Sequence, residues 1–321
     1  MTHQTTLRDP VARAARKVVQ SLLGDARAAS ASLLDSHRHG QTVADDAFHD
    51  FRVATRRLRS WQRAFTPWLG KAASHKMRRR LRAIARATGA CRDMAVQLAW
   101  LKQQRRTMTV RQRSGVDCLI AYLTERQPSH TVESLTAAHD FHALSARLGR
   151  RLERSGTATR ARSKAVHYRF GVVAARLVRE ASRALRQRLS AVHTASDETA
   201  VHKARIAAKG LRYLMEPIVR AHDDSQRSDG ERLIGQLKQL QDLLGDLRDA
   251  HVLALLVLDA EPSPGMLGIA RRLRGRRMRA FAAIERDWLG GGAAPFFDDL
   301  RLFAGELVRS TNGRRFPPDP A

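Results

Sequence analysis

The chain has 321 residues, of which 43% are hydrophobic, so it is long and apolar enough to bury a core. Its 58 lysine and arginine residues outnumber 31 aspartate and glutamate residues, and the net charge is +27 at a pI near 11.6. This composition excludes a disordered basic tail and predicts a folded protein that attracts polyanions: nucleic acid, polyphosphate or an anionic membrane.

Helical periodicity dominates the chain and strand-like alternation does not compete with it, so the predicted fold class is all-α. Asp45 or Asp46 before one segment, and Ser196 or Asp197 before another, are typical helix caps. The glycine-rich 290–295 segment predicts a loop, and the proline-rich tail 313–321 is expected to fray. Helices are predicted over 10–37, 46–66, 70–88, 91–126 (with a break compatible with the pattern), 131–153, 160–193, 199–221, 227–244, 246–260, 264–288 and 295–310.

A helical segment that begins at His49 is repeated 153 residues later, from His202. Both copies carry histidine at offset 0, cations at offsets +3, +7 and +10, and leucine at +9. Because a helix turns about 100° per residue, the four polar positions fall within roughly 80° and form one basic face. The opposite face of each copy is apolar and predicts packing in a core: Phe51, Ala54, Leu58, Trp61 and Phe65 in the first, and Ala204, Ala207, Leu211, Leu214 and Ile218 in the second.

The repetition continues downstream at an offset of 156, where apolar positions and a Gly-x-x-Arg-Asp turn recur. The pairs Arg92-Asp93 and Arg248-Asp249 either form ion-paired turns or contact a ligand, and the glycine of each turn is expected to end a helix in a left-handed cap. We predict one domain over 1–312, made of repeats at about 8–154 and 160–311 with a boundary at 155–159. The repeats are expected to form two helical bundles related by pseudo-two-fold symmetry.

The duplicated His-x-x-Arg-x-x-x-(Arg/Lys)-x-x-Arg helix, followed by turns that end in Arg-Asp, resembles the CHAD family, the conserved-histidine α-helical domain, over nearly the whole chain. The resemblance implies two four-helix bundles around a basic central cavity that binds inorganic polyphosphate and can place the protein on polyphosphate granules. Many members also carry a CYTH triphosphatase domain, whose Glu-x-Glu-x-Lys pattern does not occur here. The implied phosphate contacts are His49, Arg52, Arg56 and Arg59, His202, Arg205, Lys209 and Arg212, the adjacent Arg57 and Lys203, and Arg82 and Lys238 in the third helices.

Cations spaced along a helix suit a linear polyanion, because charge-assisted contacts from Arg or Lys to phosphate oxygens are strong. Gly210 replaces the cation that Arg57 supplies in the first copy, so the two faces are not expected to hold the ligand equally. The two histidines either contact phosphate, pack structurally or bind a metal. Dense positive charge opposes a divalent cation, and we predict no metal and no cofactor. A second ridge of His75, Arg78 or Arg79, Arg82 and Arg86 either lines the same groove or forms a solvated face.

Three functions compete, and the leading hypothesis is a non-enzymatic polyphosphate-binding protein. A metal-dependent phosphohydrolase of polyphosphate or organic triphosphates would need convergent carboxylates, whereas the acidic pairs at 45–46, 223–224 and 298–299 share no repeated face, and P-loop and nucleophile motifs are missing. A general nucleic-acid binder fits the charge, but only 5% of residues are aromatic and they are not interleaved with cations. We therefore predict no enzymatic activity, and weak, salt-sensitive nucleic-acid binding as a side effect of charge.

The compartment is predicted from cysteine content and apolar runs. Cys91 and Cys118 are too few for a disulfide framework and are typical of a reducing cytosol. The first ten residues lack the apolar segment of a signal peptide, and the longest apolar run, 252–258, is far shorter than the roughly 20 residues that span a bilayer. A cytoplasmic protein without membrane insertion is expected.

Overall fold

The computed structural model describes residues 6–39, 45–158, 168–222, 224–259 and 264–312. Nearly all of them are helical and no β-strand forms among them, so the predicted all-α class is confirmed. The helices are α1 (Val11–Arg38), α2 (Asp45–Ala64), the short α3 (Thr66–Leu69) with a 3-10 turn η1 (Gly70–Ala73), α4 (His75–Ala87), α5 (Gly89–Arg106), α6 (Val110–Ala158), α7 (Phe170–Leu189), α8 (Glu198–Arg220), α9 (Asp224–Asp259), α10 (Pro264–Trp288) and α11 (Ala294–Asn312).

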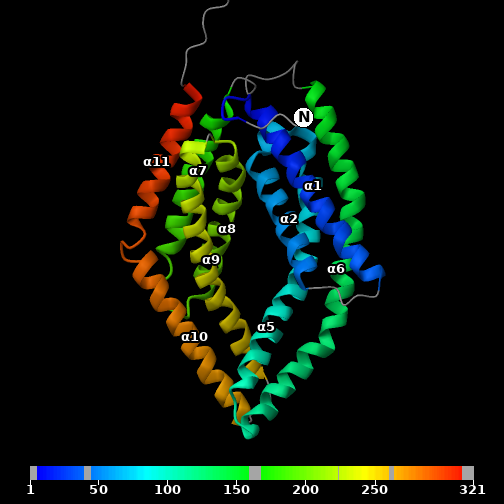
Figure 1. The fold of residues 1–321 in the computed structure, drawn as a ribbon, viewed down its shortest axis with the longest axis vertical. Helices are drawn as coiled ribbons and strands as arrows, with labels where there is room; N and C mark the ends of the chain where they lie inside the picture. Colours follow the sequence, from blue (N-terminus) through cyan, green and yellow to red (C-terminus); the bar gives the residue numbers. More distant parts are fainter. Residues whose placement is uncertain (1–5, 40–44, 159–167, 223, 260–263, 313–321) are drawn as a thin grey trace, which may run out of the picture.

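The helices form two groups that diverge from a common lower end (Figure 1). One group contains α1, α2 and the C-terminal part of α6, and the other contains α7, α8, α11 and the first part of α9. Below them, α5 and α10 converge with the remaining parts of α6 and α9. The two helices that carry the repeated motif, α2 and α8, contact each other across the middle of the molecule.

The main core joins residues from both predicted repeats. The Trp61 ring on α2 stacks on Phe65 at 4.5 Å between centroids and lies 6.2 Å from Phe170 of α7. The Trp61 indole also donates a hydrogen bond of 2.8 Å to the carbonyl of Tyr213 on α8. Burying a large aromatic ring while satisfying its N–H strongly favours one packing arrangement, so Trp61 fixes how the motif helices meet.

The apolar faces predicted for the motif helices are confirmed. Phe51, Leu58, Trp61 and Phe65 are fully buried, and Ala54 is nearly so. On α8 the corresponding positions are buried, except that Ala207 is half-buried. A second, smaller core lies at the lower end and is made by α5, α6, α9 and α10, with Leu98, Leu101, Val116, Leu119, Leu253, Ile269 and Leu273 among its buried residues.

Two predicted helix breaks are wrong. The gap between 126 and 131 does not exist, because α6 runs through Pro128 as one helix. Proline removes one helical hydrogen bond, but α6 packs on both sides of it, with Leu123 in the smaller core and Leu135 in the main core. In this part of the chain, the break that occurs is the one compatible with the pattern inside 91–126, at 107–109 between α5 and α6.

The second wrong break is at Gly245, which lies inside the continuous helix α9. The left-handed caps predicted at Gly89 and Gly245 are also wrong, because the positive-φ glycines of the described chain are Gly70, Gly290 and Gly291. Leu244 and Leu247 are both buried beside Gly245, and their packing holds this segment in the helix. Gly290 and Gly291 confirm the predicted loop, with φ of 54° and 105°.

Several helix ends agree with their sequence signals. Asp197 is the N-cap residue of α8, although its carboxylate accepts hydrogen bonds from the preceding loop, from the backbone N–H groups of His193 at 2.7 Å and Thr194 at 2.8 Å. These hydrogen bonds lower the Asp197 pKa. Asp45 is instead the first helical residue of α2. The predicted boundary begins inside the last turn of α6, and its residue 159 lies outside the described residues, as does the tail 313–321.

Candidate functional site

The basic faces of α2 and α8 meet in a group that we call the central cluster: Arg52, Arg56, Arg205 and Lys209, with the carboxylates of Asp93 and Asp249. The pKa of Lys209 is lowered to about 7, first by burial and then by the positive charges of Arg205, Arg56 and Arg52 in that order of strength. These four cations occupy offsets +3 and +7 of the two motif copies. The structure thus brings together the middle of each predicted basic face.

The carboxylates of the central cluster come from the repeated Arg-Asp turns. Arg52 Nη2 donates a hydrogen bond of 3.0 Å to Asp93 Oδ1, and the Arg52 residue is only 8% exposed. Asp249 is half-buried near Arg205; burial raises the pKa of Asp249, Asp93 acts in the same direction, and Arg205 opposes them. The sequence left the role of these turns open, and the structure assigns Asp93 as an ion-pair partner of a motif arginine from another helix. The Arg92 side chain lies outside the described part.

The cations at offset +7 differ in how firmly they keep their protons. Burial lowers the pKa of Arg56 to about 10, with Arg52 acting in the same direction. At neutral pH the Arg56 guanidinium therefore remains charged, whereas a lysine with a pKa of about 7 is protonated only about half of the time. Burial contributes the largest part of both pKa shifts, so these two side chains are largely removed from solvent.

The two repeated histidines have different environments. Arg248 on α9 donates a hydrogen bond to Nδ1 of His202, which assigns the proton of the neutral ring to Nε2. Burial lowers the His202 pKa, and Arg248, Arg205 and Lys209 lower it further, so the ring is neutral at pH 7 and presents an Nε2–H donor. His49 is exposed near the beginning of α2, one turn before Arg52. The histidines are thus matched in sequence but not in surroundings.

Two other implied phosphate contacts lie against an internal carboxylate. Glu216 of α8 is ion-paired through Oε2 with Arg57 Nε of α2 at 2.8 Å, and through Oε1 with Arg212 Nε at 3.6 Å. The Glu216 side chain is 13% exposed. Sequence analysis missed this residue, although it lies 14 positions after His202 and therefore on nearly the same helical face.

A second cationic group continues from Arg59 toward α4. Burial lowers the Arg59 pKa, and Arg82, Arg63 and Arg86 lower it further, so each of these three guanidinium groups lies close enough to repel that of Arg59. The α4 ridge therefore lies beside the first motif helix. His75 at its beginning is exposed.

The remaining predicted contacts lie elsewhere. Lys203 is exposed and lines a cavity of about 550 Å³ at the beginning of α8, next to Asp197 and Glu198. Lys238 is exposed on α9, and within the described chain no ion pair links it to the central cluster. The structure therefore does not bring either lysine to the cluster.

Two comparisons with known proteins point to the same family. The family model of the CHAD domain matches residues 25–258. The crystal structure of the CHAD domain from the plant Ricinus communis is similar with a TM-score of 0.63 and 15% sequence identity, over 99% of this chain and 96% of that chain. Among curated proteins, none matches the chain. None of the helices in the described ranges has the length and apolarity required to cross a membrane.

Proposed function

Because the chain belongs to the CHAD domain family, we propose that it binds inorganic polyphosphate with the facing basic sides of α2 and α8. One observation carries this proposal: four cations in the central cluster lie beside two carboxylates, at a site where burial lowers the pKa of Lys209 to about 7. An excess of positive charge is unfavourable at a partly buried site unless an anion compensates it. Polyphosphate supplies about one negative charge per phosphate and presents no bases that need recognition.

The cations outline a path for a linear anion. Arg52, Arg56 and Arg59 follow one face of α2 over roughly 10 Å of helix rise. Beyond Arg59 the charge continues with Arg82 and Arg86 of α4. A chain of phosphates would begin at the central cluster and extend along this ridge, and a protein that binds in this way would collect on polyphosphate granules.

We further propose that the protein binds polyphosphate without cleaving it. Hydrolysis assisted by a metal would need carboxylates that are free to hold Mg²⁺. The two carboxylates of the central cluster are instead occupied by arginine, since Asp93 accepts from Arg52 and Asp249 is held near Arg205. Incubation with Mg²⁺ or Mn²⁺ should release no phosphate over many equivalents of polyphosphate. Multiple turnovers that disappear in Asp93→Asn would establish a hydrolase instead.

The binding proposal is tested by competition at about 150 mM salt between long-chain polyphosphate and duplex DNA of equal total charge. Polyphosphate should bind more tightly, because the cluster offers charge without base-reading side chains. The double variant Arg56→Gln with Lys209→Gln should weaken polyphosphate binding about a hundredfold, as the loss of two charge-assisted contacts predicts. It should also reduce the dependence of affinity on salt.

A matched control removes the same charge elsewhere. Arg13 on α1 and Arg183 on α7 are exposed, and Arg13→Gln with Arg183→Gln should change polyphosphate affinity by less than about twofold at this salt concentration. Equal losses in both double variants would mean that the overall charge binds polyphosphate and that the central cluster is not the site. Tighter binding of DNA than of polyphosphate would make nucleic acid the primary ligand.

A further inference from the structure

A cationic pocket lies between α5 and α10, outside the repeated motif. It has a volume of about 360 Å³, and a neighbouring cavity of about 430 Å³ shares Trp100, Arg276 and Arg279 with it. Both volumes fall within the ~300–1,000 Å³ that is usual for small-molecule sites. Neither cavity is lined by a cation of the central cluster.

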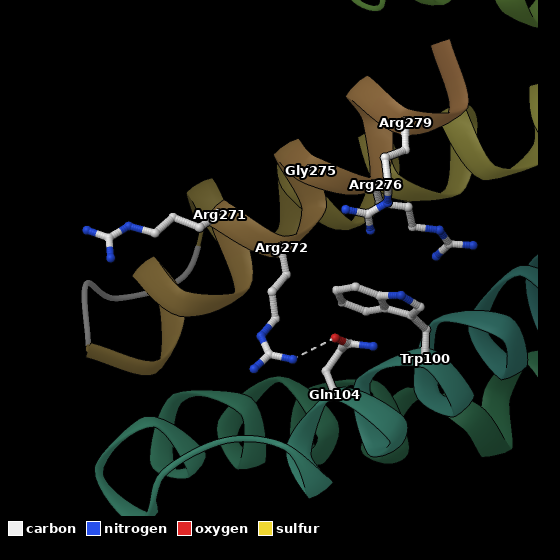
Figure 2. Close-up of a pocket in the computed structure, with 7 residues that line it drawn as sticks. All are labelled: Trp100, Gln104, Arg271, Arg272, Gly275, Arg276 and Arg279. Atoms are coloured by element: carbon white, nitrogen blue, oxygen red, sulfur yellow. Dashed lines mark hydrogen bonds between the residues drawn. The ribbon is translucent and has the colours of Figure 1, made fainter. Parts of the chain in front are cut away.

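One wall of this pocket is held in place by Arg272. Its guanidinium donates to Gln104 Oε1 at 3.0 Å, to Thr107 Oγ1 at 2.7 Å and to the Thr107 carbonyl at 3.2 Å, and so ties α10 to the end of α5. Figure 2 shows this bond to Gln104 beside the Trp100 ring. Because the Gln104 oxygen accepts from Arg272, the Gln104 amino group is the part that can donate to a ligand.

Other cations of the pocket are not fully compensated. Arg276 is paired with Asp246 at 2.6 Å, but its Nη1 is buried and lacks a hydrogen-bond acceptor within the described part of the chain. Arg271 and Arg279 are exposed and enter no hydrogen bond or ion pair with the described residues. The pocket therefore combines a fixed wall with guanidinium groups that can bind an anion.

Trp100 gives this pocket a feature that inorganic phosphate does not require. Its ring is half-buried, with the Arg276 guanidinium 5.7 Å from the ring centroid. Figure 2 shows the ring beside Gln104 and beneath Arg276 and Arg279. An aromatic surface next to arginines suits a ligand that carries both a flat ring and phosphates. We propose that the α5–α10 pocket binds a nucleoside polyphosphate, with the base on Trp100 and the phosphates at Arg276 and Arg279.

Gly275 lies on the α10 wall of this pocket. It lies one turn before Arg279 and lines the pocket, and a Cβ at this position would come within 3.3 Å of Arg279 Nη1. Glycine inside a helix is about 1 kcal/mol less favourable than alanine. A side chain here would crowd the Arg279 guanidinium, one of the two groups that we place against the phosphates.

The proposal is tested by calorimetric titration of the full chain with ATP and with inorganic triphosphate. The parent should bind ATP about tenfold more tightly, in the range that base–aromatic stacking supplies. Trp100→Leu should reduce ATP affinity to that of triphosphate and leave triphosphate affinity unchanged, while Trp100→Phe should keep most of the preference. Arg279→Gln should weaken both ligands. Arg274→Gln is the matched control, because Arg274 is exposed on α10 and lines neither cavity.

Equal affinity of the parent for ATP and triphosphate would overturn the proposal without any variant. A preference for ATP that survives in Trp100→Leu would place the base elsewhere and would also overturn it. The titration is repeated with Arg56→Gln and Lys209→Gln in place, because phosphates can also bind at the central cluster. The ATP preference should persist there, so failure of the pocket and failure of the polyphosphate site give different results.

Discussion

The two motif helices carry almost the same basic pattern, yet the structure gives their cations different chemistry. At offset +7, α2 has Arg56 with a pKa of about 10, and α8 has Lys209 with a pKa of about 7. Both side chains are largely desolvated and surrounded by the same arginines. The comparison teaches that spacing along a helix positions charge, whereas residue type and burial determine the protonation state at neutral pH.

The helices also differ in how their charge is balanced. Arg57 of α2 has Gly210 as its counterpart on α8, where an added Cβ would meet nothing within 4 Å. Arg57, the extra cation of α2, forms an ion pair with Glu216 of α8. The departure from the repeat is therefore compensated by a carboxylate on the opposite helix.

The largest effects are expected where the two helices are alike. Leu58 and Leu211 occupy matched positions and are both fully buried. Leu58→Ala and Leu211→Ala should each lower the free energy of unfolding by about 2–5 kcal/mol, because each leaves a cavity in the main core. Chemical denaturation measures the loss. A loss in one variant without a comparable loss in the other would break the equivalence of the two packing faces.

The next largest effect is a pH dependence of polyphosphate affinity, which follows from the different protonation of Arg56 and Lys209 at neutral pH. A bound polyanion favours the charged lysine, so binding should draw a proton onto Lys209 when the pH is above about 7. Polyphosphate affinity should rise about tenfold as the pH falls from 8 to 6, since one proton is linked to binding over this range. Titration at several pH values measures this dependence.

Lys209→Arg is the control for this dependence, because arginine keeps its charge across the same range. The affinity of this variant should change much less between pH 8 and 6. We assign the change in affinity between pH 8 and 6 to Lys209, because the His202 pKa is lowered and that ring gains its proton only under more acidic conditions. An equally steep pH dependence in Lys209→Arg would assign the titrating group to another residue.

A smaller effect concerns folding itself. The Lys209 pKa is lowered from 10.5 on folding, so the charged lysine opposes folding at all pH values below its unfolded pKa, and the opposition is complete below about 7. Lys209→Met removes the buried charge while keeping a long side chain, and should raise the melting temperature by a few degrees. The gain should be larger at pH 6 than at pH 9. A gain that does not depend on pH would mean that Lys209 keeps its proton in the folded protein over this range, so that folding does not lower its pKa.

Much of the fold could be predicted from the sequence, because helical periodicity is a local signal. The apolar faces around Leu58 and Leu211 and the ends of α10 follow from residue spacing alone. The breaks at Pro128 and Gly245 were wrong, since both residues are held in helices by buried leucines on either side. Distant packing outweighed the local preference of proline and glycine there.

The site could be predicted only in part. Repetition of cations at +3 and +7 pointed to the central cluster, because a helical face can be calculated from the sequence. The pairing of Asp93 with Arg52 could not be predicted, since it depends on how α5 packs on α2. The Trp100 pocket was missed for the same reason: its tryptophan and arginines come from helices that are far apart in the chain.

The smallest effect is expected from removing the Glu216 charge, which tests whether Glu216 competes with the ligand for Arg57 and Arg212. Glu216→Gln removes the negative charge shared by Arg57 and Arg212, while the amide keeps the size of the side chain. Polyphosphate affinity should rise about threefold, a modest gain because salt screens the two released charges, and the free energy of unfolding should fall by about 1 kcal/mol. Glu231→Gln on α9 is the control, since Glu231 is exposed and pairs with Arg227 alone among the arginines of the described chain. Weaker binding in Glu216→Gln would show instead that Glu216 orients Arg57 and Arg212 toward the ligand, and the asymmetry between the two helices would then serve binding directly.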